Sequence, residues 1–539
     1  MTLRMLTAAT AAALVLTLSA CGGGNDHDAA PPPGQGTPPP TQPEPPPPPP
    51  PPAQGTAKIS GRVTNALDGQ GIAQVTVTAG GASGVTSDDG SYTLTTVSPG
   101  ASVLVSFAKS GLVPQSRATS ALTAADASTV VNVPMLPVAV RETFNAQAAR
   151  DIAVPGSTAM VRLSAGSLRR PDGSVPTGQV TAQVTPIAPA SDVNVMPGNY
   201  LAATDAGAAP MESFGALDAS FTDADGTPVN LAAGSTATVR IAPSSRSGTL
   251  PASVPLFFYN TTTGLWVKEG SAALQGAAPN QYYEGTVTHF TTWNADQIYN
   301  TVRINGCVQD AAGARVAGAL VTSEGKSYTG QASTITNANG EFSVAAKRVS
   351  DVFVVATTNA ELSNAPTINV GNQDQALDGC LTLTRSALSI KLTWGGSPSD
   401  LDSHTLGANA GEHVYYSDKG SLATAPFVAL DVDDIDSFGP EVTTFAKLAK
   451  NRTYRFYVRN YSSTFDPGQT GSPARVEVNN RGTQTIFAPP AGESSNTDFW
   501  HVFDLRTDES CNASLVPVQQ FLETAPAEVN TDANAQYCN

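Results

Sequence analysis

The sequence has few charged and few aromatic side chains, and positive charge is the scarcest. Among 539 residues, Asp, Glu, Lys and Arg make up 14% and Phe, Trp and Tyr 6%. Only 29 Lys and Arg oppose 45 Asp and Glu, so the formal net charge is −16. A nucleic-acid-binding surface needs clustered Lys and Arg to neutralise phosphates. The sequence has no such cluster, which excludes nucleic acid as a partner and argues against a charge-based hold on anionic lipid.

The first twenty residues have no hydrophobic run long enough to span a bilayer. The apolar stretch Leu6–Leu18 (LTAATAAALVLTL) has thirteen residues, whereas a transmembrane helix needs about 20. Arg4 precedes this stretch and supplies the positive end of an export signal. The start of the chain therefore predicts a secretory signal.

The residues that end this stretch, LSAC at Leu18–Cys21, resemble the lipobox of bacterial lipoproteins. In that family a peptidase cuts before the cysteine, and the cysteine sulfur carries a diacylglycerol. The resemblance implies a signal peptide at 1–20, a lipidated N-terminal Cys21 and a protein anchored to the membrane of the cell envelope. Gly22 after the cysteine implies the outer membrane. An ordinary secretory signal with an incidental cysteine is the alternative.

Residues 21–56 form a proline-rich linker that includes eight consecutive prolines, Pro45–Pro52. Proline has a fixed φ and no backbone N–H, so this run is expected to be extended polyproline II and cannot build a core. We interpret the linker as a stalk that holds the folded part away from the membrane. A ligand for an aromatic groove is the alternative.

The chain has only five cysteines. Without Cys21 an even number remains, as expected for disulfides in an oxidising compartment. Cys307, Cys380, Cys511 and Cys538 can form two disulfides in three ways. No two of these cysteines have the CxxC spacing of a zinc or redox site. We expect the local pairings, Cys307 with Cys380 and Cys511 with Cys538.

From residue 57 onwards the chain alternates polar and apolar residues between turns rich in Gly, Asn and Asp. Val75 and Val77 show this period of two, as do Tyr92 and Leu94, and SDDG at Ser87–Gly90 is a tight-turn signal between them. The pattern predicts an all-β protein, built of tandem β-sandwich modules after the signal peptide and the linker.

Two stretches resemble the carboxypeptidase regulatory-like domain, a transthyretin-like β-sandwich. The resemblance implies modules at 57–137 and 301–385 with a structural or binding role. The matching residues of the first stretch are Ile59, Gly61, Val63, Gly71, Val75, Val77, Thr86, Asp89, Gly90, Tyr92, Leu94, Gly100 and Gly111. Those of the second are Gly306, Val308, Ala319, Val321, Thr336, Gly340 and Phe342.

Two further β-rich stretches resemble other exported modules. Residues 138–300 are distantly similar to the ZU-type β-domain of ankyrins and netrin receptors. Residues 386–516 resemble the YfaP-like domain, an exported β-sandwich of unknown biochemical function, through a tryptophan strand, DLDSH, HVYY and DVDDIDSFGPE. A C-terminal tail is expected at 517–539.

The zinc site of the metallocarboxypeptidases is missing. That site needs a His-x-x-Glu pair and a distant histidine. The residues three positions after His289, His404, His413 and His501 are Thr, Gly, Tyr and Asp. We therefore expect no carboxypeptidase activity. His289, Phe290 and Trp293 could form a sugar-stacking cluster or pack one end of a sandwich, and we favour packing.

Two polar segments of the YfaP-like stretch could together hold a metal ion. In an extended segment, Asp400, Asp402 and His404 project to one side, and His413 can join them from the next strand. Carboxylates suit Ca²⁺, whereas an imidazole favours a transition metal. The spacing excludes an EF-hand loop. The second segment contributes Asp431, Asp433, Asp434, Asp436 and Glu441.

Three interpretations of these segments stay open: acidic turns with hydrogen-bonding histidines, a bound divalent cation, and a catalytic metal or acid–base pair. No motif demands a cofactor, and Ca²⁺ is the one candidate. We expect a non-enzymatic, lipid-anchored envelope protein with a binding, adhesion or structural role. Its expected partners are the membrane, through the lipid, and an envelope protein or glycan. The alternative is a metal-dependent hydrolase with its site in the C-terminal domain.

Overall fold

The structure is a computed structural model that describes residues 56–100, 102–119, 122, 128–358, 361–472, 474–480 and 483–538. These residues belong to one compact unit, Gln54–Asn539. The predicted signal peptide at 1–20, the lipidated Cys21 and all but the last residue of the linker at 21–56 lie outside the described residues.

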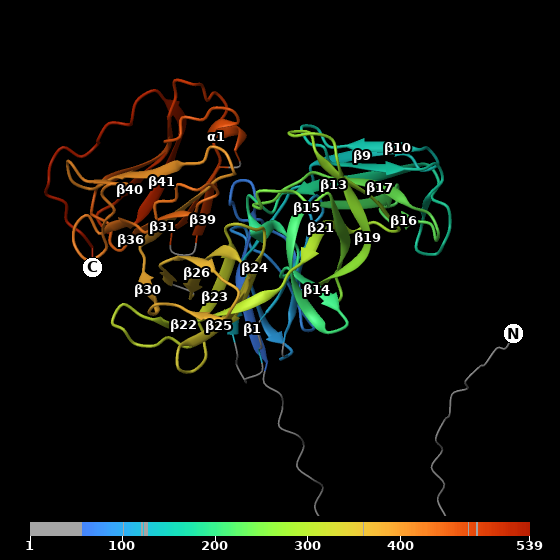
Figure 1. The fold of residues 1–539 in the computed structure, drawn as a ribbon, viewed down its shortest axis with the longest axis horizontal. Coiled ribbons are helices and arrows are strands. Elements are labelled where there is room, and N and C mark those ends of the chain that lie inside the picture. The colour runs from blue at the N-terminus through green and yellow to red at the C-terminus, as the bar shows by residue number, and fades with distance from the viewer. Residues whose placement is uncertain are drawn as a thin grey trace, which may run out of the picture. The chain divides into compact units, whose positions relative to one another are not determined.

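The predicted all-β class is confirmed, because strands make up nearly all the regular structure (Figure 1). The described residues contain only two helical elements, a 3-10 turn η1 (Val193–Val195) and α1 (Gly468–Gly471). No described helix has the length and apolar character needed to cross a membrane.

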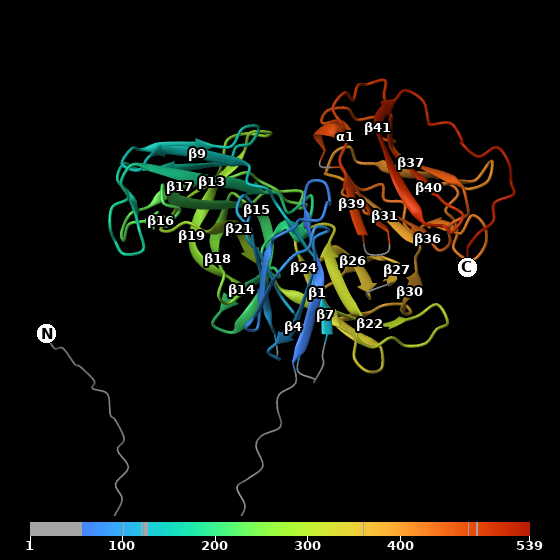
Figure 2. The ribbon, with the colours of Figure 1, turned by 180° about the vertical axis from the view of Figure 1, so that it is seen from behind.

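The first strands form two four-stranded sheets, ordered β4-β1-β7 with β8 beside β1, and β3-β2-β5-β6. Both sheets contribute to one core, which includes Ile59, Val77 and Phe107. They therefore form a β-sandwich, with β1, β4 and β7 side by side in Figure 2. The strands are β1 (Ala57–Asn65), β2 (Thr76–Ala79), β3 (Ala82–Val85), β4 (Ser91–Val97), β5 (Leu104–Ala108), β6 (Gln115–Ala118), β7 (Ser128–Val130) and β8 (Val133–Met135).

A thirteen-stranded sheet follows, with the main order β10-β11-β17-β20-β19-β18-β21-β15-β13-β9. Period-two alternation is clear in β13, where Val180, Ala182 and Val184 are all buried. The strands are β9 (Val140–Asn145), β10 (Arg150–Ala153), β11 (Met160–Leu163), β12 (Leu168–Arg169), β13 (Gln179–Ile187), β14 (Leu201–Thr204), β15 (Gly207–Asp223), β16 (Pro228–Leu231), β17 (Ala237–Ile241), β18 (Ser253–Asn260), β19 (Leu265–Gln275), β20 (Tyr282–Val287) and β21 (Thr292–Ile298).

A nine-stranded sheet has the main order β24-β23-β26-β27-β30-β22-β25. The disulfide Cys307–Cys380 joins β22 to the start of β30 and confirms the first predicted pairing. The strands are β22 (Thr301–Gln309), β23 (Leu320–Gly325), β24 (Gln331–Ile335), β25 (Glu341–Lys347), β26 (Ser350–Thr357), β27 (Glu361–Ser363), β28 (Thr367–Val370), β29 (Gln375–Ala376) and β30 (Leu381–Arg385).

The segments around β1–β4 and β22–β25 repeat the same local hydrogen bonds. Thr86 Oγ1 accepts from Val75 N and donates to Ile72 O, and Thr336 Oγ1 accepts from Ala319 N and donates to Val316 O. Gly90 O and Gly340 O accept from Val63 N and Val308 N, both at 2.8 Å. The two segments therefore share these turn hydrogen bonds as well as their sequence pattern.

The last strands form two sheets, ordered β34-β35-β36-β31-β38-β39 and β33-β32-β37-β40-β41. Leu388, Ile390, Leu392 and Trp394, at every second position of the tryptophan strand, are all buried in the core between these sheets. The strands are β31 (Leu388–Thr393), β32 (Leu401–Leu406), β33 (His413–Val414), β34 (Gly420–Ser421), β35 (Val428–Leu430), β36 (Glu441–Phe445), β37 (Thr453–Asn460), β38 (Arg475–Asn480), β39 (Thr483–Phe487), β40 (Phe499–Thr507) and β41 (Ala513–Leu522).

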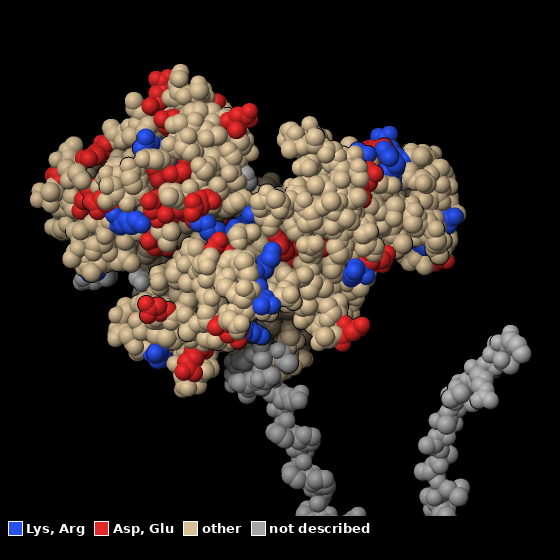
Figure 3. Space-filling model, viewed as in Figure 1, with Lys and Arg blue, Asp and Glu red and all other residues tan. Residues whose placement is uncertain are grey.

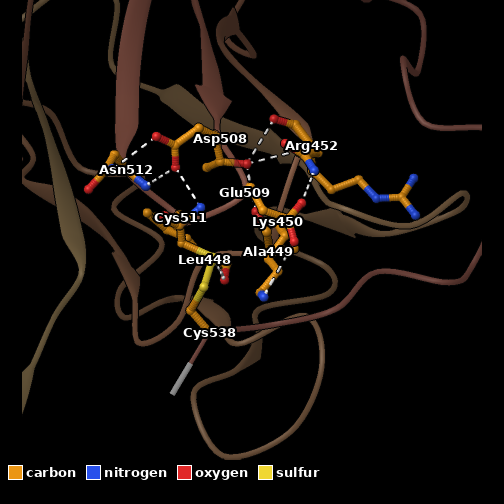
Figure 4. Close-up of a disulfide and its surroundings, with 12 residues drawn as sticks. Leu448, Ala449, Lys450, Arg452, Asp508, Glu509, Cys511, Asn512 and Cys538 are labelled. Carbon is orange, nitrogen blue, oxygen red and sulfur yellow. Dashed lines mark hydrogen bonds and ion pairs between the residues drawn. A yellow bond between two sulfur atoms is a disulfide. The ribbon is translucent and has the colours of Figure 1, made fainter.

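The C-terminal residues return to this last sandwich. The disulfide Cys511–Cys538 confirms the second predicted pairing and ties the chain end to the turn between β40 and β41. Figure 4 shows Cys538 beside Leu448, whose carbonyl accepts from Cys538 N at 2.9 Å. The predicted division between residues 516 and 517 falls inside β41, which continues to Leu522.

Candidate metal centre

The two polar segments meet in the C-terminal sandwich, where β32 and β36 begin. Asp402 is the second residue of β32, Glu441 is the first residue of β36, and Asp433 lies in the connection between β35 and β36. Each of the three offers a carboxylate oxygen, and these oxygens all lie within 4.8 Å of one another. Asp402 and Glu441 belong to different sheets of the sandwich. A cation held by all three would therefore link the two sheets.

Backbone hydrogen bonds fix Glu441 in this position. Its Oε2 accepts from Ser403 N at 2.6 Å, and its Oε1 accepts from Asp434 N at 3.4 Å. Glu441 is 0% exposed. The carboxylate thus joins β32 to the acidic connection, and it retains lone pairs for a further ligand because each oxygen has two.

Several carboxylate oxygens of this cluster are buried and unpartnered. Asp400 Oδ1, Asp402 Oδ2 and Asp433 Oδ1 have no hydrogen-bond partner within the described parts of the chain. Buried polar atoms are rarely left without a partner, because desolvation costs about 1–3 kcal/mol or more for each. Buried, unpartnered carboxylate oxygens from two segments that meet are typical of an empty cation-binding site.

Burial and mutual repulsion dominate the electrostatics of the cluster. Burial raises the pKa of Asp402 to about 7, with the charges of Asp400 and Asp433 adding to the effect. Burial likewise raises the pKa of Asp400 to about 6, and that of Glu441 well above its usual range. A bound cation would relieve this repulsion, as would protons.

The other predicted acids of the second segment have different roles. Asp431 braces the connection: its Oδ1 accepts from Val442 N at 3.0 Å. Asp434 forms an ion pair with Lys326 and accepts from Asp436 N. Asp436 is exposed. Among the described residues, none of these three belongs to the group whose ligand atoms lie within 4.8 Å.

The two predicted histidines form a pair beside the acidic cluster. His404 Nδ1 lies 2.9 Å from His413 Nε2, and the Tyr457 hydroxyl lies 3.3 Å from the same His413 atom. The His404 ring stacks on Tyr457 with centroids 4.7 Å apart and 9° between the planes. Burial, followed by the neighbouring His413, lowers the pKa of His404 to about 3. His404 is therefore neutral at ordinary pH.

Two residues of the site were missed by sequence reasoning. Tyr457 and Arg459 lie opposite His404 and Asp402 in the register of β37 with β32. Their signal was the alternation in RTYRFYVRN, because a strand that pairs with β32 presents every second residue to the same face. Arg459 opposes the burial effect by lowering the pKa of Asp402, yet no ion pair joins the two in the described structure.

The aromatic rings around His289 pack into the protein core, which is the alternative that the sequence analysis favoured over a sugar-stacking cluster. Trp293 is 1% and Phe290 7% exposed, and both belong to the core. Trp293 Nε1 donates to His289 O at 3.0 Å. These rings offer no exposed platform for a sugar.

The surface of the C-terminal sandwich carries many of the acidic side chains in view. Figure 3 shows Asp and Glu gathered over the part coloured orange to red in Figure 1, with Lys and Arg at the border of the group. A surface with an excess of negative charge attracts cations.

No protein-family model matches the chain, and no curated protein sequence matches it. Among solved structures, the TIE protein of Bacillus anthracis is 11% identical with a TM-score of 0.13, over 61% of this chain and 51% of that one. The chain thus spans about half the length of the TIE protein.

The solved structures of two major pilins are about as weakly similar to this chain as the TIE protein is. The pilin BcpA of Bacillus cereus is 9% identical with a TM-score of 0.14, over 61% of this chain and 99% of its own. The full-length pilin SpaD of Corynebacterium diphtheriae is 8% identical with a TM-score of 0.15, over 61% and 98%. These TM-scores are too low to carry an argument about arrangement or function.

Proposed function

We propose that this protein is a non-enzymatic, lipid-anchored β-sandwich protein of the bacterial cell envelope, with a binding, adhesion or structural role. We further propose that its YfaP-like module, residues 386–516, binds one divalent cation. The convergence of Asp402, Asp433 and Glu441 within 4.8 Å carries the cation proposal. The lipobox-like LSAC supports the anchor, Gly22 after the cysteine supports an outer-membrane location, and an envelope protein or glycan is the proposed partner.

The distances suit a bound ion. Ca²⁺ binds oxygen at about 2.3–2.6 Å, so two oxygens on one ion lie at most about 5 Å apart. The group spans 4.8 Å at most. Without a cation, the buried Asp402 and Glu441 and the half-buried Asp433 must repel one another or take up protons.

A cation here would have a structural effect on the module. Asp402 lies in the sheet of β32 and β37, whereas Glu441 lies in the sheet of β31 and β36. An ion bound to both, and to Asp433 of the connecting segment, would tie the two sheets together at the starts of β32 and β36. A ligand that binds only the folded state stabilises it in proportion to the logarithm of its concentration over the dissociation constant.

Thermal unfolding of the full chain tests the proposal. After EDTA treatment, the melting temperature should rise with added CaCl₂ or MnCl₂, and Asp402→Asn should abolish the rise. Asp418→Asn is the matched control, because Asp418 is an exposed acid of the same module and its variant should respond like wild type. An unchanged melting temperature in both salts, or an equal response in Asp402→Asn, would overturn the cation site. Metal-dependent turnover of a hydrolysable substrate would overturn the non-enzymatic role.

A further inference from the structure

An open hollow of about 500 Å³ lies on the second of the two repeated segments, and residues of β22, β24 and β25 line it. These strands lie close together in Figure 1, and β24 contacts β25 although the two are not hydrogen-bonded neighbours in the sheet. Sites for small ligands have volumes of about 300–1,000 Å³. The hollow is therefore large enough for a small molecule or for one unit of a polymer.

The polar side chains of the hollow are free to bind a ligand. Asn305, Thr334 and Ser343 line it, and none of their side chains has a hydrogen-bond partner among the described residues. Glu341 adds a carboxylate, whose Oε2 accepts from Asn337 Nδ2 at 3.0 Å. Amides and hydroxyls both donate and accept, whereas a carboxylate only accepts. This set of groups suits a neutral ligand with several hydroxyl groups.

An exposed apolar patch borders the same hollow. Ile335 lines the hollow and lies opposite Leu320 in the register of β24 with β23. Side chains at opposite positions of an antiparallel pair are neighbours on one face, and both residues are 38% exposed. An apolar face of a ligand can therefore pack on Ile335 while its polar groups reach the hollow.

The first repeated segment provides an internal comparison, because the strand registers and turn hydrogen bonds show which positions correspond. In the hollow these are Asn305 with Ser60, Thr334 with Gly84, Asn337 with Ser87, Glu341 with Ser91, and Ser343 with Thr93. Four of the five positions thus carry Asn, Thr or Glu where the first segment has Ser or Gly. The fold does not require these larger polar side chains, because the first segment forms the same strands and turn without them.

We propose that the hollow on β22, β24 and β25 binds a neutral saccharide unit of an envelope glycan. Asn305, Thr334 and Glu341 bond its hydroxyl groups, and a C–H face of the sugar ring packs on Ile335. The carboxylate of Glu341 and the net charge of −16 disfavour an acidic sugar. This inference rests on the proposed binding role of the protein and is independent of the cation site.

Saturation-transfer NMR of the full chain tests the inference, with neutral oligosaccharides of glucose, mannose, galactose and N-acetylglucosamine as probes. We expect at least one probe to bind with a Kd on the order of 1 mM. The double variant Asn305→Ser, Glu341→Ser has the residues of the first segment at these positions. It should bind about tenfold more weakly, because two hydrogen bonds are lost, and should keep its melting temperature, because both side chains are exposed. Asn339→Ser is the matched control, since Asn339 is an exposed amide of the same turn that does not line the hollow.

Amide exchange measured by mass spectrometry locates the bound probe without any variant. The probe should slow exchange in residues 331–343 and leave the corresponding residues 82–93 of the first segment unchanged. Protection only outside 331–343, unchanged affinity of the double variant, or no binding of any of the four probes would overturn the inference. Those results leave the proposed anchor and cation site standing, whereas cleavage of a bound probe would overturn the proposed non-enzymatic role.

Discussion

The buried carboxylates of this protein differ in whether a basic side chain lies beside them. Asp223 Oδ2 accepts from Arg170 Nε at 2.6 Å, and this hydrogen bond lowers the pKa of Asp223. Asp296 is 0% exposed and accepts from Asn294 Nδ2 at 2.5 Å, and no ion pair reaches it in the described residues. Burial raises the pKa of Asp296 well above its ordinary value.

These opposite shifts predict opposite responses to pH. The unfolded pKa of an aspartate is about 3.9, so the raised pKa of Asp296 means that stability is lost as pH rises from about 4 through the folded value. Asp296→Asn removes this loss. The melting temperature of the variant minus that of wild type should therefore increase from pH 4 to pH 7, measured by circular dichroism.

Asp223→Asn provides the contrast. A lowered folded pKa gives stability that is present above about pH 4 and disappears as pH falls through the folded value. The melting-temperature difference of Asp223→Asn should therefore be most negative at pH 7 and shrink in acid. Profiles of the same slope for the two variants would contradict one of the two assignments, and flat profiles would contradict both.

At the scale of elements, β32 and the connection from β35 to β36 decide whether the acidic group exists. The connection is braced where Asp431 bonds the backbone of Val442. The chain end adds a second brace to the same sandwich: Asn530 Nδ2 donates to Gly407 O and Thr453 O, and the disulfide Cys511–Cys538 closes this segment.

Removal of the second disulfide should loosen the chain end. The double variant Cys511→Ser, Cys538→Ser opens a loop with a sequence separation of 27. The chain-entropy model gives such a loop about 3–4 kcal/mol of stabilisation. We expect a lower melting temperature and faster amide exchange for the residues after β41, measured by mass spectrometry. Unchanged exchange there would show that side-chain packing alone holds the segment.

At the scale of the whole molecule, charge gives no hold on a membrane. The net charge is −16, and the face seen in Figure 3 carries Lys and Arg singly or in small groups. Binding to anionic lipid requires clustered basic residues near the surface. We therefore propose that the lipid on Cys21 supplies the attachment.

Replacement of that cysteine should release the protein. Full-length Cys21→Ser should incorporate no labelled fatty acid and should appear in the soluble envelope fraction, whereas wild type sediments with membranes. Gly24→Ser, three residues further on, is the control and should behave as wild type. A Cys21→Ser chain that still sediments with membranes after a salt wash would show that another part of the protein binds them.

Strand alternation and cysteine spacing could be predicted from the sequence because both depend on short-range order. A buried strand face repeats every second residue, as in β13 and β31, and each disulfide joins cysteines that bracket one stretch of strands. The ring contacts of His404 could not be predicted, because His413 and Tyr457 reach it from two other strands.

The sequence by itself determined the all-β class, the two disulfides and the two acidic segments that meet. Only the tertiary structure decided which acids converge. Asp402 was specified by the alternation of β32, whereas Asp431, Asp433, Asp434 and Asp436 lie in an irregular connection without periodicity. Asp431 is held by a contact with Val442 and Asp434 by one with Lys326, and both partners lie outside this connection. An irregular segment takes its geometry from its neighbours, so its ligands emerge only once the chain has folded.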